Sequence, residues 1–69
     1  MKVTYKAARI NAGLNLVDAS KEIGVNKSTL CAYENGKRDP NTSVLLKMCD
    51  AYGCEIGDLK LNKKEDDEI

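Results

Sequence analysis

Two short helical segments only three residues apart constrain the fold of this chain more than any other feature of its sequence. Asn15 can cap a helix that ends at Gly24, and Asn26 can cap a second helix that runs to about Glu34. So short a connection forces the two helices to pack at a steep angle. Such packing needs small residues where the backbones approach, and Ser20 and Gly24 supply them.

Helical periodicity continues on both sides of this pair. Apolar residues recur at helical spacing, first as Val3, Ala7, Ile10 and Leu14, and no stretch keeps the alternation of a half-buried strand. The further elements that we predict are a first helix from the cap Thr4 to about Ala12, a fourth helix between Asn41 and Gly53, and a short fifth helix carrying Ile56 and Leu59. The fold class is therefore all-α, with five helices.

Length and charge limit the domain organisation. The 69 residues, about half of a usual domain, suffice for one small domain, which we assign to residues 1–61. Residues 62–69 are almost entirely polar and are predicted to form a disordered acidic tail. The net charge is zero, yet residues 1–40 carry seven basic and four acidic groups, whereas residues 41–69 carry four and seven. The first half of the chain is the better partner for an anion.

Several classes of function find no support in the sequence. The chain has no His, and its three cysteines, Cys31, Cys49 and Cys54, lack the spacing of a zinc site. We therefore expect no metal, no cofactor and no enzymatic activity. The first residues turn charged before an apolar run can form, which predicts neither a signal peptide nor a membrane span. A cytoplasmic protein with free thiols is the simplest interpretation.

The segment that follows Asn26 predicts one buried and one exposed helix face. At about 100° per residue, Thr29, Leu30 and Tyr33 fall on one side, and the opposite side carries Lys27, Ser28, Cys31 and Ala32. A lysine in the first turn opposes the helix dipole, which costs several tenths of a kcal/mol. A contact between this helix end and a phosphate or a guanine edge would account for Lys27 at that position. Lys37 and Arg38 extend the basic surface past the helix end.

These segments resemble the small DNA-binding domain of the Cro and lambda-repressor type, also called the Xre family. The resemblance covers about Thr4 to Leu59. The motifs that carry it are Ala8-Arg9, Ala12-Gly13-Leu14, Ser20 with Gly24-Val25-Asn26, Ser28-Thr29-Leu30, and Tyr33-Glu34-Asn35-Gly36-Lys37-Arg38 followed by Pro40. It implies a compact five-helix domain with a helix-turn-helix at helices 2 and 3, the third helix entering the major groove of double-stranded DNA.

The resemblance also assigns roles to residues. It implies base-edge contacts for Lys27, Ser28 and Ala32, the last suited to a thymine methyl. Residues expected nearer the DNA backbone are Asn15, Asn26, Asn35, Lys37 and Arg38. Family members tend to pair a first-helix arginine with a glutamate at the end of helix 3, which here implies a pair between Arg9 and Glu34. They usually begin helix 2 with glutamine, and Leu16 in that position implies the loss of one backbone contact.

Two functions remain as alternatives. The first is a sequence-specific transcriptional regulator, a repressor that binds a pseudo-palindromic operator as a homodimer, with Ile56 and Leu61 as the expected dimer surface. The second is a protein-interaction module that keeps the repressor fold and docks a protein partner on the Cys31 and Ala32 face. The zero net charge and Leu16 favour the protein-interaction module. The combined specificity of the motifs that match the family favours the transcriptional regulator.

Overall fold

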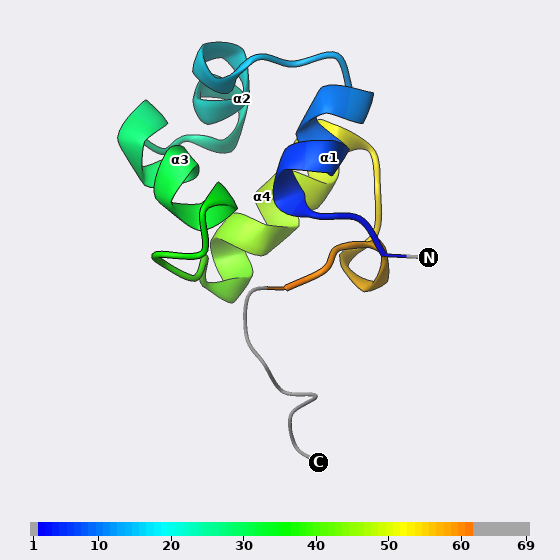
Figure 1. Ribbon diagram of the computed structural model, residues 1–69. Helices are drawn as coiled ribbons and strands as arrows, with labels where there is room; N and C mark the ends of the chain where they lie inside the picture. The colour runs from blue at the N-terminus through cyan, green and yellow to red at the C-terminus, as the bar shows by residue number, and fades with distance from the viewer. Residues whose placement is uncertain (1, 62–69) are drawn as a thin grey trace.

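Four α-helices and one 3-10 turn make up the part of the chain that the structure, a computed structural model, describes (Figure 1). This part is residues 2–61, so the predicted acidic tail over 62–69 lies outside it. The elements are α1 (Tyr5–Asn11), α2 (Leu16–Ile23), α3 (Lys27–Glu34), α4 (Thr42–Tyr52) and η1 (Ile56–Asp58). Because residues 2–61 contain no strand, the all-α prediction is confirmed.

Side-chain caps begin three of the four helices. The hydroxyl of Thr4 accepts a hydrogen bond from the backbone N–H of Ala7 at 3.1 Å. The amide oxygens of Asn15 and Asn41 accept in the same way from residues three positions on, at 2.7 and 2.9 Å. Asn26 occupies the same position before α3, but its side chain makes no capping bond. The predicted cap is therefore wrong for Asn26 alone, which leaves a helix-start N–H group without that partner.

A left-handed glycine makes the tight turn between α2 and α3 possible. Gly24 has a φ of 90°, a conformation that side chains with a Cβ rarely adopt. The backbone N–H groups of Gly24 and Val25 both donate to the carbonyl of Ser20, at 2.8 and 3.0 Å. This closure ends α2 and turns the chain at once into α3. Ser20 is buried, as the close approach of the two helices requires.

The core forms between the four helices and the segment that follows η1. Met48 of α4, Ile23 of α2 and Leu30 of α3 are almost completely buried, together with Leu59. The buried face predicted for α3 is thus correct. The α1 stripe is different, because Ile10 is 55% exposed and the buried residues of this helix are Tyr5, Ala8 and Arg9.

The predicted fifth helix is only a single 3-10 turn. Leu59 lies beyond this turn and pairs with Val3 in an isolated parallel β-bridge. The N–H of Val3 donates to the carbonyl of Asp58 at 2.9 Å, and the N–H of Lys60 donates to the carbonyl of Val3 at 2.7 Å. Leu59 is therefore buried through pairing of extended backbone with the first residues of the chain. Helical periodicity in the sequence carries no signal for such a pairing.

A buried ion pair fixes α3 to α1. The Nε of Arg9 lies 2.7 Å from Oε2 of Glu34, and Nη2 of Arg9 lies 3.3 Å from Oε1. A third guanidinium hydrogen bond, from Nη1, reaches the carbonyl of Leu14 at 2.9 Å. The two side chains are only 9% and 6% exposed. The pairing that the resemblance implied is therefore present, and it joins both helices to the loop before α2.

The same pair influences a neighbouring tyrosine. Burial raises the pKa of Tyr52 to about 12, and the nearby carboxylate of Glu34 also raises it, while Arg9 lowers it by a smaller amount. The pKa of Arg9 is itself raised, chiefly by its hydrogen bond with Glu34. The guanidinium therefore stays charged at any physiological pH, and its attraction for Glu34 is permanent.

We expect Met48→Ala to lower the free energy of unfolding by about 2–5 kcal/mol, because it opens a cavity at the centre of the core. Leu46→Ala removes a side chain of similar size from the same helix, but Leu46 is 57% exposed. This control should change the stability by less than about 0.5 kcal/mol. Urea unfolding followed by circular dichroism measures both variants. Equal losses of stability would contradict the packing described.

Glu34→Ala should cost about 3–5 kcal/mol, because it leaves the guanidinium of Arg9 buried without its carboxylate. Glu22→Ala, which removes an exposed glutamate from α2, is the matched control and should cost little. The double variant Arg9→Met with Glu34→Leu should be more stable than Glu34→Ala, because no buried charge remains. Thermal unfolding compares the three variants, and an unchanged midpoint for Glu34→Ala would show that the pair contributes nothing.

Candidate nucleic-acid interface

Helix α3 turns one face to the core and leaves the other open. Leu30 and Tyr33 are buried, with exposed fractions of 0% and 6%. Lys27 and Ser28 are exposed, and Ala32 is half-buried further along the helix. The division of faces predicted from the helical periodicity is thus present in the structure. Lys27 and Ser28 stand at the beginning of the open face, where a helix entering a groove makes its first contacts.

The loop after α3 is folded tightly against the helix end. Gly36 has a φ of 79°, which reverses the chain direction. The backbone N–H groups of Lys37 and Arg38 then donate to the carbonyl of Ala32, at 2.9 and 3.4 Å. Buried Pro40 follows and leads into α4. These contacts hold the exposed side chains of Lys37 and Arg38 just beyond the C-terminal end of α3.

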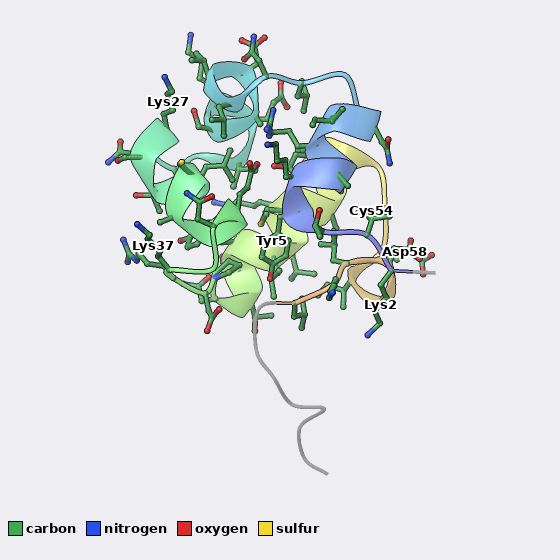
Figure 2. All side chains as sticks on the ribbon, in the orientation of Figure 1. Lys2, Tyr5, Lys27, Lys37, Cys54 and Asp58 are labelled. Atoms are coloured by element: carbon green, nitrogen blue, oxygen red, sulfur yellow. The ribbon has the colours of Figure 1, made fainter. Side chains whose placement is uncertain are left out.

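Figure 2 shows how the two basic positions lie. Lys27 at the start of α3 and Lys37 after its end are on the same side of the molecule, away from Lys2 and Asp58. An α-helix with its side chains is about 10–12 Å in diameter, close to the width of about 12 Å of the major groove of B-DNA. Lys27 and Lys37 therefore lie at the two ends of the exposed surface of α3. We call this surface the α3 ridge, and a helix of this diameter fits that groove.

Two of the asparagines expected at the DNA backbone are already engaged within the chain. Asn35 donates from Nδ2 to the sulfur of Cys31 at 3.4 Å, so the predicted exposed thiol has a polar neighbour on the same helix face. The amide oxygen of Asn15 holds the start of α2 through Asp18, as described above. Asn26, in contrast, is exposed beside Lys27. The structure thus groups all predicted site residues on α3 and its flanking segments except Asn15, which belongs to the start of α2.

Leu16 explains why α2 departs from the pattern of the family that the sequence resembles. It is the first residue of α2, and it is half-buried because it packs against the core. A leucine directed inward cannot make the polar contact that glutamine makes in that position. Its neighbour Val17 is 44% exposed instead, which gives the start of α2 an apolar surface.

The three cysteines belong to α3, to α4 and to the segment after α4. Cys31, Cys49 and Cys54 are all free thiols and half-buried. The pKa of Cys49 is raised, first by burial and then by neighbouring Cys54. No three residues of the types that bind metals cluster anywhere within residues 2–61. Over the same range, every helix is too short or too polar to cross a lipid bilayer.

Comparison with known proteins assigns this arrangement to a family. The sequence model described as helix-turn-helix matches residues 6–59. An uncharacterised HTH-type transcriptional regulator of Methanocaldococcus jannaschii is 35% identical over 99% of this chain and 100% of its own length. The HTH-type transcriptional regulator ImmR of Bacillus subtilis is 29% identical over 93% of this chain. The cryptic phage CTXphi transcriptional repressor RstR of Vibrio cholerae is 35% identical over 74% of it.

The relatives differ in length. The chain spans the whole of the archaeal relative but only 54% of ImmR and 46% of RstR. None of the solved structures matches the chain. The family match covers both helices of the tight pair, the Arg9–Glu34 contact and the α3–α4 loop. With its fold, its motifs and this match in agreement, the chain belongs to the helix-turn-helix family of the Cro and lambda-repressor type.

Proposed function

We propose that this protein is a sequence-specific regulator of transcription that binds double-stranded DNA with α3 in the major groove. The observation that carries the proposal is the ridge formed by α3, with exposed Lys27 at one end and Lys37 at the other. The relatives, which are named as transcriptional regulators and a repressor, support the same function. Repression is the mode of action that we propose, because a bound operator excludes other proteins from the same DNA.

Within this function, the residues of α3 divide into two groups. Lys27, Ser28 and Ala32 read base edges, since they share the outward face of the helix. Lysine suits the acceptors of guanine, and a half-buried alanine suits a thymine methyl. The residues that hold the DNA backbone are Asn15, Asn26, Asn35, Lys37 and Arg38. Because Leu16 offers no polar side chain, the N–H groups at the start of α2 provide the phosphate contact there.

A dimer is the proposed form on DNA. A single α3 covers one half-site, and two copies whose α3 helices lie about 34–36 Å apart would read a pseudo-palindrome. Ile56 is 40% exposed in η1, and Leu61 is half-buried nearby in sequence. These apolar side chains form the proposed contact between two copies, away from α3.

The rival function is a protein-interaction module, and the exposed Val17 beside α3 is the observation that favours it. Salt separates the two functions. A DNA complex with several phosphate contacts loses affinity steeply between about 50 and 200 mM salt, because counterions are released on binding. An apolar protein contact through Val17 and Ala32 would change little over the same range.

The first experiment is selection of bound duplexes from a random DNA pool at about physiological salt. We expect enrichment of an inverted repeat. On that site, Lys27→Ala should weaken binding by about 1–3 kcal/mol and relax the preference at one base pair of each half-site. Lys37→Ala should weaken binding to all sequences alike and reduce the salt slope of the dimer by about two.

Lys47→Ala is the matched control for both lysine variants. Lys47 is an exposed lysine of α4, outside the proposed DNA surface, so its loss should leave the sequence preference unchanged. If no motif is enriched while the protein remains folded, the operator-binding function is wrong. If a motif is enriched but Lys27→Ala preserves the full preference, α3 does not read the bases through this residue.

Ile56→Asp tests the dimer. The charged side chain should prevent apolar contact between two copies, so that the sedimenting mass at high protein concentration falls to that of one chain. Leu46→Asp is the control, because Leu46 is exposed but lies on α4 outside the proposed contact. Equal mass for Ile56→Asp and the unchanged protein would place the dimer contact elsewhere.

A further inference from the structure

Two of the three cysteines lie on either side of the turn that ends α4. Cys49 belongs to the last turn of this helix, and Cys54 is the first residue after Gly53. Gly53 has a φ of 68°, and the backbone N–H groups of Gly53 and Cys54 both donate to the carbonyl of Cys49, the second at 3.1 Å. This helix end is of the Schellman type, which brings the residue after the glycine against the helix residue five positions before it.

The second of these hydrogen bonds limits the distance between the two cysteines. The path from the Cα atom of Cys49, through its carbonyl oxygen, to the N and Cα atoms of Cys54 spans at most about 7 Å. Because this path is bent, the two Cα atoms lie closer together than that limit. Disulfides in proteins join Cα atoms about 4.4–6.8 Å apart. The backbone of the turn therefore places the two cysteines within reach of a disulfide.

The side chains of this pair also meet. The pKa of Cys49 is raised, first by burial and then by the charge of Cys54 and a side-chain hydrogen bond with Cys54. Both thiols are half-buried and pack against the core. The sulfur of Cys31 has a different neighbour, since it accepts a hydrogen bond from Nδ2 of Asn35 at 3.4 Å. The structure therefore pairs Cys49 with Cys54 and leaves Cys31 on a separate helix.

We propose that Cys49 and Cys54 form a modification site, a pair of thiols that hydrogen peroxide oxidises to a reversible disulfide. The disulfide closes a ring of six residues across the end of α4. Where thiols are kept reduced, the disulfides that do form are usually transient or redox-sensing. The structure, in which both cysteines are free, represents the reduced form of the site.

The oxidation needs no co-reactant other than peroxide. The thiolate sulfur of Cys54 attacks one oxygen of hydrogen peroxide, the O–O bond breaks, and the departing hydroxide takes up the proton that the thiol released. The products are a sulfenic acid on Cys54 and one water molecule. The sulfur of Cys49 then attacks the sulfenic sulfur, the S–O bond breaks, and the departing hydroxide takes the thiol proton of Cys49 to form a second water molecule.

The surroundings of the pair select this order and this oxidant. The thiolate is the reactive form, and the raised pKa of Cys49 keeps its thiol protonated, so Cys54 reacts first. The charges of Asp58 and Asp50 also raise the pKa of Cys49, so the pair lies in a negative field. Such a field disfavours anionic oxidants such as glutathione disulfide, whereas hydrogen peroxide is small and neutral.

The site lies apart from the proposed DNA surface. Figure 2 shows Cys54 and Asp58 on one side of the molecule, and Lys27 and Lys37 on the other. The disulfide joins the last turn of α4 to the segment that carries η1 and buried Leu59. Oxidation therefore acts on the stability of the domain and leaves the α3 ridge open, whether or not that ridge binds DNA.

Tryptic peptide mapping of the full folded chain tests the pairing. Trypsin cleaves after lysine and arginine, so residues 48–60 form one peptide with both cysteines, and residues 28–37 form another with Cys31. After peroxide treatment and alkylation of the remaining thiols, peptide 48–60 should lack the mass of two hydrogen atoms and carry no alkyl group. Cys31 should still be alkylated. Treatment with dithiothreitol should restore both alkylation sites of peptide 48–60.

Single variants test the order of attack. Cys49→Ser should stop at the sulfenic acid, which dimedone traps on Cys54. Cys54→Ser should give at least about threefold less trapped product, because the raised pKa of Cys49 disfavours its thiolate. Equal trapping in the two variants would contradict this order. Two alkylated thiols in peptide 48–60 after peroxide treatment, or a disulfide that joins it to peptide 28–37, would overturn the proposed pair.

Gly53→Ala tests whether the turn brings the thiols together. A φ of 68° strains a residue with a Cβ, so alanine should loosen the turn and slow disulfide formation about threefold or more. Gly57→Ala is the matched control, because Gly57 has no positive φ and its Cβ position is open. Equal rates for the two variants would mean that proximity along the chain, and not the turn, determines the reaction.

Thermal unfolding tests whether the disulfide fits the folded domain. The oxidised protein should unfold about 4 °C or more above the reduced protein, because the closed ring restricts the unfolded chain. The double variant Cys49→Ser with Cys54→Ser should show no such shift after the same treatment. An equal or lower midpoint for the oxidised protein would mean that the disulfide strains the turn, and it would refute modification of the folded domain at this site.

Discussion

The buried contact between Arg9 and Glu34 is the interaction on which the placement of α3 depends. Its three guanidinium hydrogen bonds reach Glu34 at the end of α3 and the carbonyl of Leu14 before α2. The side chain of Arg9 thereby links α1 both to the end of α3 and to the segment just before α2. A buried ion pair adds little net stability relative to apolar packing, but its loss is costly, and its geometry is strict. We regard it as the contact that sets the angle at which the proposed DNA-binding face of α3 is presented.

Around that pair, backbone hydrogen bonds in two tight turns hold the segments on either side of α3. Gly24 turns α2 into α3, and Gly36 folds the following loop back onto the carbonyl of Ala32. These closures use groups that every residue has, so the outward side chains remain available for variation. In the proposed complex with DNA, the same scaffold would read different sequences when Lys27, Ser28 or Ala32 is replaced, while the core beneath them is unchanged.

The helix-turn-helix could be predicted from sequence because its signals are local. Helical periodicity separates Leu30 from Lys27 without any knowledge of the rest of the chain, and Asn15 and Asn41 act as caps within three residues. Prediction was less successful where distant segments decide the outcome. Ile10 continues an apolar stripe but faces outward, because the neighbours of α1 pack against Tyr5 and Ala8 instead. Arg9 and Glu34 are 25 positions apart, so their contact was accessible only through family resemblance.

The bridge between Val3 and Leu59 closes the described chain into a ring. In most small helical proteins the ends fray independently, and each can detach at little cost to the core. Here the first residues pair with the extended segment that contains buried Leu59, so separation of the amino-terminal segment also uncovers a core side chain. Fraying at one end is thereby coupled to loss of packing at the other. A domain with so few core residues gains cooperativity in this way, without the need for a longer final helix.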